Sequence, residues 1–297
     1  MPTPPTILVF CNPNAGRGRA RSFAGLIGKR LHRDGYAVGV VFEPPGLFSP
    51  DPTASYRAAI VMGGDGTLRA VAARLYEVLP DPPPILLVPM GTANLIGKHL
   101  ELAWHDRDPA DEIAAAIARY EVVPFDAGSA NGQLFLLMAS AGFDAHVVHE
   151  MDRVRTGPID FISYAFPTLL TLRDYRFPPL RVTVDGLEVF AERPAIAIVA
   201  NVPEYGMGFP FLPGARPDDR KLDVCVLPCR DRKDLLTIAL LAAAGEHAHA
   251  EGVVMAAGDR IDIDSPAATP IQLDGDAFGF TPLRIELLER RVGFIVP

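Results

Sequence analysis

The sequence predicts an α/β fold with a parallel sheet in its first half and an all-β antiparallel sandwich in its second half. Short apolar runs alternate with amphipathic helical patterns up to about residue 125, which is typical of a parallel sheet with helices on both faces. The composition then changes at residues 123–126. The β-rich runs that follow are divided by Pro, Gly and Asp, which is typical of an antiparallel sandwich.

The first half contains apolar runs that predict the buried strands of the sheet. These runs are residues 7–10, 38–42, 58–62 and 85–88. Apolar residues at helical spacing follow three of the runs, as at Ile27 and Leu31 and at Leu68 and Leu75, and predict helices between the strands. A further helix is predicted around 110–120.

The second half contains shorter runs, several of which alternate apolar with polar residues. They predict strands at 133–140, 181–190, 194–201, 222–227, 260–264, 271–273 and 283–288. The longest apolar run, 235–245, is about half of the ~20 residues that a membrane-spanning helix needs. We interpret this run as a buried helix.

Composition and charge exclude several classes of protein. The chain has 297 residues, 49% of them hydrophobic and 22% charged, so it is too apolar to be disordered and long enough for more than one small core. The 28 Lys and Arg against 36 Asp and Glu give a net charge of −8, and we therefore expect no nucleic acid partner. Three cysteines and no signal-like N-terminus predict a cytoplasmic protein without a disulfide framework.

Three Gly- and Asn-rich loops each lie between a predicted strand and a predicted helix. They are Asn12-Pro-Asn-Ala-Gly16, Gly63-Gly-Asp-Gly-Thr67 and Gly91-Thr-Ala-Asn94. Glycine lets backbone N–H groups approach a phosphate, and the start of a helix adds a partial positive charge. In parallel sheets, such loops meet at the carboxyl edge of the strands, where ligands bind. The three loops therefore predict a nucleotide phosphate site, although neither standard nucleotide signature is present.

Side chains in these loops have simpler explanations too. Thr67 can cap a helix, donate to phosphate or do both. Thr92 and Asn94 are good helix-capping residues, and capping alone would account for them. Asp65 would repel phosphates unless a cation or a hydroxyl lies between them, which indicates a metal-assisted role. The alternative for Asp65 is a tight turn with an aspartate cap.

Together with Gln272-Leu-Asp-Gly-Asp276, and with Pro89-Met preceding the third loop, these motifs resemble the diacylglycerol kinase catalytic family, which includes bacterial lipid kinases and is related to the sphingosine kinases. The resemblance covers essentially the whole chain. The Gly63–Thr67 motif alone is shared with NAD kinases, which have a related nucleotide fold.

The resemblance implies a diacylglycerol kinase-like and NAD kinase-like architecture with ATP bound between two domains. The first would comprise residues 1–124 with 290–297, and the second, β-rich and lipid-binding, residues 125–289. The nucleotide-binding residues implied by the family are Asn12, Pro13, Asn14, Ala15, Gly16, Gly64, Asp65, Gly66, Thr67, Thr92 and Asn94. The implied activity is ATP-dependent phosphorylation of a lipid alcohol, with diacylglycerol as the leading acceptor.

The resemblance also implies a Mg²⁺ loop within residues 213–223. Asp219 would supply a carboxylate, and Arg216 and Lys221 would supply carbonyl oxygens; hard oxygen ligands of this kind suit Mg²⁺. Arg220 stands where the family usually has glycine. A plain turn is the alternative interpretation of Asp218 and Asp219.

For catalysis, the resemblance implies that Asp276 accepts the proton of the lipid hydroxyl, at a position where the family usually has glutamate. Asp274 is the reserve candidate, although Asp-Gly-Asp is also good hairpin-turn chemistry. Asp65 is the third catalytic candidate. Asp144 would orient the polar head of the substrate, or would only bind backbone groups at a strand end.

Two other functions remain open on the sequence. One is an NAD kinase-like phosphotransferase with a soluble acceptor, and the other is a nucleotide-binding regulator that has lost catalysis. For a lipid kinase of acidic net charge, we expect transient, peripheral contact with the inner membrane surface during turnover. A homodimer is compatible with the sequence.

Overall fold

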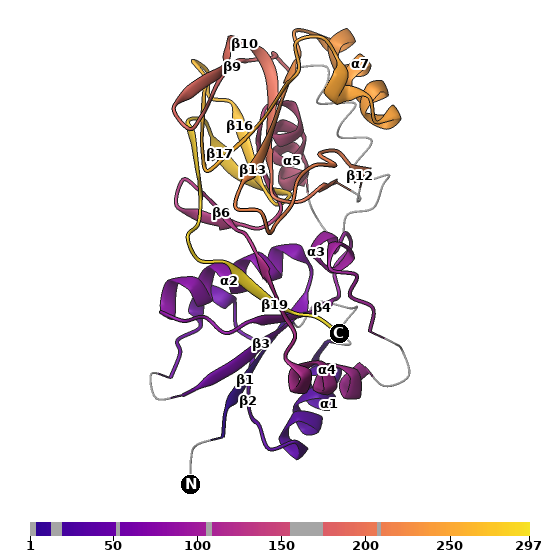
Figure 1. Cartoon of the computed structure of the whole chain (residues 1–297), viewed down its shortest axis with the longest axis vertical. Coiled ribbons are helices and arrows are strands. Elements are labelled where there is room, and N and C mark those ends of the chain that lie inside the picture. The colour runs from indigo at the N-terminus through magenta and orange to yellow at the C-terminus, as the bar shows by residue number, and fades with distance from the viewer. Residues whose placement is uncertain (1–3, 13–19, 52–53, 105–108, 155–174, 207–208) are drawn as a thin grey trace. The chain divides into compact units, whose positions relative to one another are not determined.

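The computed structural model describes residues 4–12, 20–51, 54–104, 109–154, 175–206 and 209–297. The chain divides into two compact units, Met1–Phe125 with Arg291–Pro297 and Asp126–Arg290 (Figure 1). Among the described residues, no helix has both the length and the apolar character needed to cross a bilayer.

The first unit contains a sheet that is six-stranded in the described residues, in the order β2-β1-β3-β4-β19-β5. Its strands are β1 (Thr6–Cys11), β2 (Ala37–Val41), β3 (Tyr56–Gly63), β4 (Ile85–Pro89), β5 (Val122–Phe125) and β19 (Val292–Ile295). Neighbouring strands are parallel except β5, which runs antiparallel to β19. The α/β prediction with a parallel sheet is therefore confirmed.

Helices and apolar strands build the core of this unit. Its helices are α1 (Ala20–Arg33), α2 (Asp65–Val78), α3 (Leu95–His99) and α4 (Pro109–Arg119), with a 3₁₀ turn η2 (Pro45–Leu47). On α1, Ala20, Ala24, Ile27 and Leu31 are all buried because their spacing places them on one face of the helix. Burial of Ile27 or Leu31 contributes about 1.5–3 kcal/mol each.

The second unit is built on an antiparallel sheet that is eleven-stranded in the described residues. Its strands are β6 (Gly128–Ala130), β7 (Gln133–Phe135), β8 (Met138–Ala141), β9 (Pro179–Val184), β10 (Leu187–Ala200), β13 (Leu222–Pro228), β14 (Val254–Gly258), β15 (Arg260–Asp264), β16 (Pro270–Leu273), β17 (Asp276–Phe280) and β18 (Leu283–Leu287). A separate short ladder joins β11 (Glu204–Tyr205) to β12 (Phe209–Pro210).

Alternating side chains of this sheet form one core. Leu180, Val182 and Val184 of β9 belong to it, together with Ile261 and Ile263 of β15. Every second residue of each strand points to the same face, so the alternation in the sequence becomes a single buried layer. The predicted antiparallel sandwich-like domain is therefore confirmed. The elements outside the sheet are α5 (Phe143–Val154), α7 (Arg232–Ala244) and a 3₁₀ turn, η3 (His247–His249).

The predicted burial of the apolar run 235–245 is wrong. The run forms most of α7, but no residue of α7 is buried, and the side chains of Leu236 and Leu240 are 62% and 64% exposed. The helix is instead closed at its ends, because the Asp231 side chain accepts from two first-turn amides and Gly245 ends the helix in the left-handed conformation. An apolar sequence forms the helix, but only the tertiary structure determines whether another element covers it.

Candidate functional site

The three predicted phosphate loops follow three adjacent strands. β1 pairs with β3 and β3 pairs with β4, all in parallel, so the turns after these strands meet at one edge of the sheet. The Asn12 amide donates to the Met62 carbonyl at 3.2 Å, and the Met90 amide donates to the Gly63 carbonyl at 2.8 Å. Of the first loop, Pro13, Asn14, Ala15 and Gly16 lie outside the described residues.

The second and third loops touch through their glycines. A Cβ atom built on Gly91 would lie 2.5 Å from the Gly64 Cα and 2.7 Å from the Asn94 Oδ1. Any other residue at position 91 would therefore force the two turns apart. Glycine is required here for close backbone approach rather than for a positive φ angle.

Asn94 shapes the third loop but does not cap a helix with its side chain. It has a left-handed backbone, with φ 48°, and its Oδ1 accepts from the Gly91 amide at 2.8 Å. Its Nδ2 donates back to the Gly91 carbonyl at 2.9 Å. The capping interpretation of the Asn94 side chain is therefore wrong, because both ends of the amide group close the turn instead. Thr92 in the same loop is exposed.

Asp65 links the second loop to the third. Its Oδ2 accepts from the Leu95 amide at 3.0 Å and its Oδ1 from the Ile96 amide at 3.2 Å, so the carboxylate caps α3 from another segment of the chain. Burial raises the pKa of the Asp65 carboxyl above its ordinary value, and these amide bonds oppose that rise. Asp65 therefore acts as a helix cap, as the alternative interpretation expected. The helix that it caps is α3, whereas Asp65 itself belongs to α2.

The start of α2 is suited to an anion. Its N-cap residue is Gly64, which has no side chain to accept from the first-turn N–H groups. Gly66 and Thr67 lie in this first turn, where amide groups and the helix dipole favour negative charge. Thr67 therefore is not the N-cap residue; it packs closely against Gly63, where an added Cβ would lie 2.6 Å from the Thr67 Cβ.

The two catalytic candidates of the second unit lie in and beside a tight hairpin turn. Asp274 and Gly275 connect β16 to β17, with φ angles of 49° and 85°, as a two-residue turn of this hand requires. The Asp274 carboxylate accepts from the amides of Leu136, Leu137 and Met138 at 2.8–2.9 Å. These bonds assign Asp274 a structural task, whereas Asp276 is the first residue of β17.

Asp144 lies in the first turn of α5 and contacts hydroxyl groups. The Ser140 hydroxyl donates to its Oδ2, and the Tyr205 hydroxyl donates to the same atom at 2.6 Å. Its Oδ1 is buried without a hydrogen-bond partner among the described residues. Burial raises the pKa of the Asp144 carboxyl, whereas the bonds from Ser140 and Tyr205 lower it. A buried acceptor without a donor is suited to a ligand hydroxyl.

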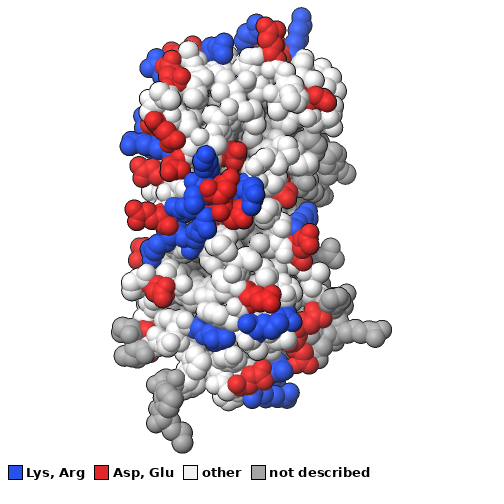
Figure 2. All heavy atoms as spheres, viewed as in Figure 1, with Lys and Arg blue, Asp and Glu red and all other residues white. Residues whose placement is uncertain are grey.

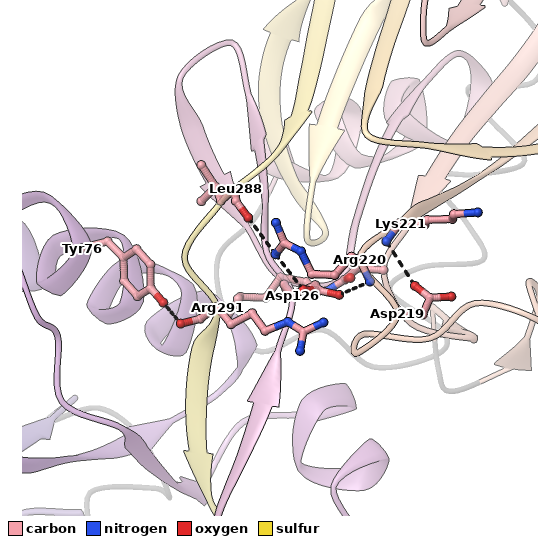
Figure 3. A network of polar contacts seen from close by, with 9 residues as sticks. Tyr76, Asp126, Asp219, Arg220, Lys221, Leu288 and Arg291 are labelled. Carbon is pink, nitrogen blue, oxygen red and sulfur yellow. Dashed lines mark hydrogen bonds and ion pairs between the residues drawn. The ribbon is translucent and has the colours of Figure 1, made fainter.

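The predicted metal loop is anchored by Arg220. This residue keeps the left-handed backbone of a glycine position, with φ 66°, and its amide donates to the Asp126 Oδ2 at 2.8 Å. Its guanidinium donates to the Asp126 Oδ1 at 3.0 Å and to the Leu288 carbonyl at 2.9 Å (Figure 3). Sequence reasoning marked Asp126 only as part of a domain boundary, because no short-range signal connects it to residue 220.

The loop around Arg220 has oxygen ligands of the type that Mg²⁺ prefers. Asp219 is exposed, and its Oδ1 accepts from the Lys221 amide at 3.1 Å. Burial raises the pKa of the neighbouring Asp223 carboxyl, and the negative charge of Asp219 raises it further. The described residues contain no group of three or more His, Cys, Asp or Glu side chains that could hold a metal ion. Mg²⁺ bound here would therefore rely on Asp219, carbonyls such as those of Arg216 and Lys221, and retained water.

The contact between Arg220 and Asp126 should contribute to the stability of the second unit. Asp126 has no exposed side-chain surface, so Arg220→Ala removes the Arg220 guanidinium from a buried carboxylate, and we expect the free energy of unfolding to fall by roughly 3 kcal/mol. Alanine keeps the same backbone preference as arginine. Arg216→Ala is the matched control, because the Arg216–Asp218 pair is exposed on both sides and solvent screens it, so its loss should change the stability little. Urea unfolding of both variants measures the difference, and equal losses would contradict this account.

Comparisons with known proteins assign the chain to a family. The sequence profile of the diacylglycerol kinase catalytic domain matches residues 6–130, and that of the YegS C-terminal NAD kinase beta sandwich-like domain matches residues 138–296. The chain belongs to the diacylglycerol kinase catalytic family.

Individual relatives of this family member are distant but similar in length. It is 21% identical over 295 residues to a diacylglycerol kinase of Bacillus subtilis (strain 168), covering 97% of this chain and 95% of the relative. It is 27% identical over 245 residues to a diacylglycerol kinase of Staphylococcus carnosus (strain TM300), covering 82% and 77%.

Solved structures share the fold. A crystal structure of a Bacillus anthracis str. Sterne protein has a TM-score of 0.74 at 23% identity, covering 99% of this chain and 95% of that one. An Archaeoglobus fulgidus NAD kinase in complex with ATP has a TM-score of 0.53 at 16% identity, covering 98% and 92%. The relation of this family member to the NAD kinase fold, which the second loop predicts, therefore extends over both units.

Proposed function

We propose that the protein is an ATP-dependent lipid kinase that transfers the γ-phosphoryl group to a lipid hydroxyl, most directly converting diacylglycerol to phosphatidic acid. The observation that carries this proposal is the backbone contact between Gly64 and Gly91, tied by Asp65, at the edge of a parallel sheet. It brings two glycine turns and the start of α2 together, as a phosphate chain needs. Membership of the family supplies the reaction class.

The residues of the first unit have the role of gripping the nucleotide. Asn12 and residues 13–16, Gly64, Gly66, Thr67 and Thr92 would contact the phosphates of ATP, while Asp65 and Asn94 hold the turns in shape. In the transfer, the oxygen of the lipid hydroxyl bonds to the γ-phosphorus as the bond to the oxygen of ADP breaks. The enzyme contributes mainly position and charge neutralisation to such a step.

The residues of the second unit have the role of presenting the acceptor. Asp276 would take the proton of the lipid hydroxyl, and Asp274 would keep its turn in place through the amides of 136–138. Asp144 would orient the polar head through its Oδ1. Mg²⁺, when bound, supplies positive charge that neutralises phosphate oxygens or stiffens the loop at Asp219.

A transfer assay with a panel of acceptors tests the proposal. Purified protein is incubated with labelled ATP, Mg²⁺ and, separately, diacylglycerol, a sphingoid base and NAD. Labelled phosphatidic acid is the expected product. Labelled sphingoid base would retain the lipid kinase and replace its acceptor, and labelled NADP would favour a soluble acceptor. ATP binding without transfer to any acceptor would favour a regulator that lacks catalysis.

A lipid substrate requires contact with a membrane surface, and we propose that α7 makes this contact. From Leu235 to Ala244 the helix has no charged residue, and none of its side chains is buried. The surface around α7 is mostly uncharged in Figure 2, whereas acidic and basic side chains gather along the left side and in the lower half of that view. Lys233 in the first turn of the helix adds a positive charge that complements anionic lipid headgroups.

We therefore expect the double variant Leu236→Asp and Leu240→Asp to lose at least tenfold in affinity for anionic phospholipid vesicles, measured by co-sedimentation. Turnover of a short-chain, water-soluble diacylglycerol should change less than threefold, because the change is confined to an exposed face. Leu187→Asp is the matched control, since that leucine is 73% exposed at the end of a strand. Unchanged vesicle affinity, or a shift from dimer to monomer in light scattering, would assign this face to another partner.

A further inference from the structure

Gln272 is a buried glutamine that connects two sites of the second unit. It lies on β16, opposite Ser140 of β8, and is only 2% exposed. Its Oε1 accepts from the Gly275 amide at 2.8 Å, and its Nε2 donates to the Ser140 Oγ at 2.9 Å. Both ends of the amide group are therefore used, one toward the hairpin turn before Asp276 and the other toward α5.

These contacts fix the direction of a hydrogen-bond chain. A backbone N–H only donates, so the oxygen of Gln272 must face Gly275 and its nitrogen must face Ser140. The Ser140 hydroxyl, which has one proton, is then free to donate to Asp144. Every bond from Gly275 to Asp144 thus points the same way and ends on the carboxylate. Such aligned bonds polarise and strengthen one another.

The turn at one end of this chain is held at both of its residues. The Asp274 carboxylate accepts from three amides of residues 136–138, and Gln272 accepts from the Gly275 amide. Asp276 follows directly. At the other end of the chain, the Asp144 Oδ2 accepts from Ser140 and from Tyr205. The Asp144 Oδ1 is left buried without a donor among the described residues.

We propose that Gln272 is a positioning residue that couples the acceptor-orienting carboxylate of Asp144 to the turn that directly precedes Asp276. This inference rests on the proposed function, because it concerns how the two carboxylates of that site are held in register. One carboxylate orients the acceptor and the other takes its proton, so an error of about 1 Å between them is costly in rate. Gln272 limits that error because it binds the Gly275 amide of the turn directly and contacts Asp144 through the Ser140 hydroxyl.

The test replaces Gln272 with methionine, which has a similar volume but neither hydrogen-bonding group. We expect kcat/KM for the lipid to fall at least tenfold, while the KM for ATP stays within twofold. The acid limb of the pH dependence of kcat/KM should move to higher pH, because loss of an oriented Ser140 donor raises the pKa of Asp144. Gln133→Met is the matched control, because Gln133 is exposed on β7, and it should alter none of these values.

A second variant, Gln272→Glu, separates the two halves of the link. Glutamate still accepts from the Gly275 amide but cannot donate to Ser140. Hydrogen exchange should therefore show a Gly275 amide at least tenfold faster in Gln272→Met and unchanged in Gln272→Glu, with the amides of 136–138 protected in both. The lipid defect and the pH shift should appear in both variants. In a double-mutant cycle with Ser140→Ala, the effects of Gln272→Met and Ser140→Ala should be non-additive.

The outcomes distinguish this inference from the function on which it rests. A wild-type protein that phosphorylates no lipid rejects the proposed function. An active wild type with an unchanged lipid kcat/KM in folded Gln272→Met rejects the positioning role alone. If kcat/KM falls equally for lipid and for ATP in Gln272→Met, with a lower melting temperature and no pH shift, Gln272 is only a packing residue. If Gln272→Met does not fold, Ser140→Ala must show the same loss of lipid kcat/KM and the same pH shift. If Ser140→Ala shows neither change, the positioning role is also rejected.

Discussion

Asp276→Asn is expected to reduce phosphoryl transfer to the lipid by about 10²- to 10⁴-fold, the usual contribution of a general base, while ATP still binds. Asparagine has nearly the same shape as aspartate but cannot take the hydroxyl proton. Transfer from labelled ATP measures the first effect, and isothermal titration with a non-hydrolysable ATP analogue measures the second. The loss should appear in kcat, because the substitution removes no part of the glycine loops.

Two controls sharpen this result. Asp276→Glu restores a carboxylate that is one methylene longer and should keep activity well above that of Asp276→Asn. Glu286→Gln neutralises an exposed acid of β18 and should leave activity unchanged. Full activity in Asp276→Asn would remove Asp276 from catalysis. Asp274 is then a weak substitute, because its carboxylate already binds three amides.

Gly91→Ala is expected to weaken ATP binding at least tenfold and to destabilise the first unit by about 1–3 kcal/mol, as overpacking does. The added methyl group would meet the Gly64 Cα at 2.5 Å, and neither backbone can yield without moving a turn. Because Asp65 ties the same turns to α3, the displacement should reach the start of that helix as well. Titration with the ATP analogue and thermal unfolding give the two measurements.

The same substitution at Gly25 provides the control. Gly25 lies in the middle of α1, and a Cβ there would meet nothing within 4 Å. Gly25→Ala should therefore stabilise the protein by up to about 1 kcal/mol, because alanine is the better helix former, and should leave ATP binding unchanged. If Gly91→Ala bound ATP as the wild type does, contact between the two turns would not matter for the nucleotide.

Much of the architecture could be predicted from local pattern. The apolar run 58–62 lies within β3, and the run 85–88 lies within β4, because a strand buried on both faces has no polar positions. Some predicted strand boundaries were wrong, because a Pro that was expected to end a strand does not end it. The predicted strands 181–190 and 194–201 are instead β9, which ends at Val184, and β10, which continues from Leu187 to Ala200 through Pro194. β14 was not predicted at all.

In the candidate site too, some features could be predicted from the sequence and others could not. The glycines and the acid Asp65 at strand ends could be predicted because their chemistry is local, as at Gly64, whereas Asp274 and Asp276 were candidates only through the resemblance to the family. The partners of those acids could not be predicted, because they lie far away in the sequence: Asp65 caps α3 about 30 residues later, and Asp274 binds amides near residue 137. Arg220 departs from the glycine that is usual in the family, and its partner Asp126 lies 94 residues earlier in the sequence.

The amino-acid sequence by itself determined the order of strands and helices, the glycine turns and the family, because apolar periodicity and backbone freedom act over a few neighbouring residues. Only the tertiary structure decided that α7 stays exposed, that Asp274 is an anchor and that Gln272 joins Asp144 to the turn before Asp276. These features depend on which strands pair and on which donor meets which acceptor. Such pairings bring together groups more than a hundred residues apart, as between Ser140 and Gln272, and no local signal encodes them.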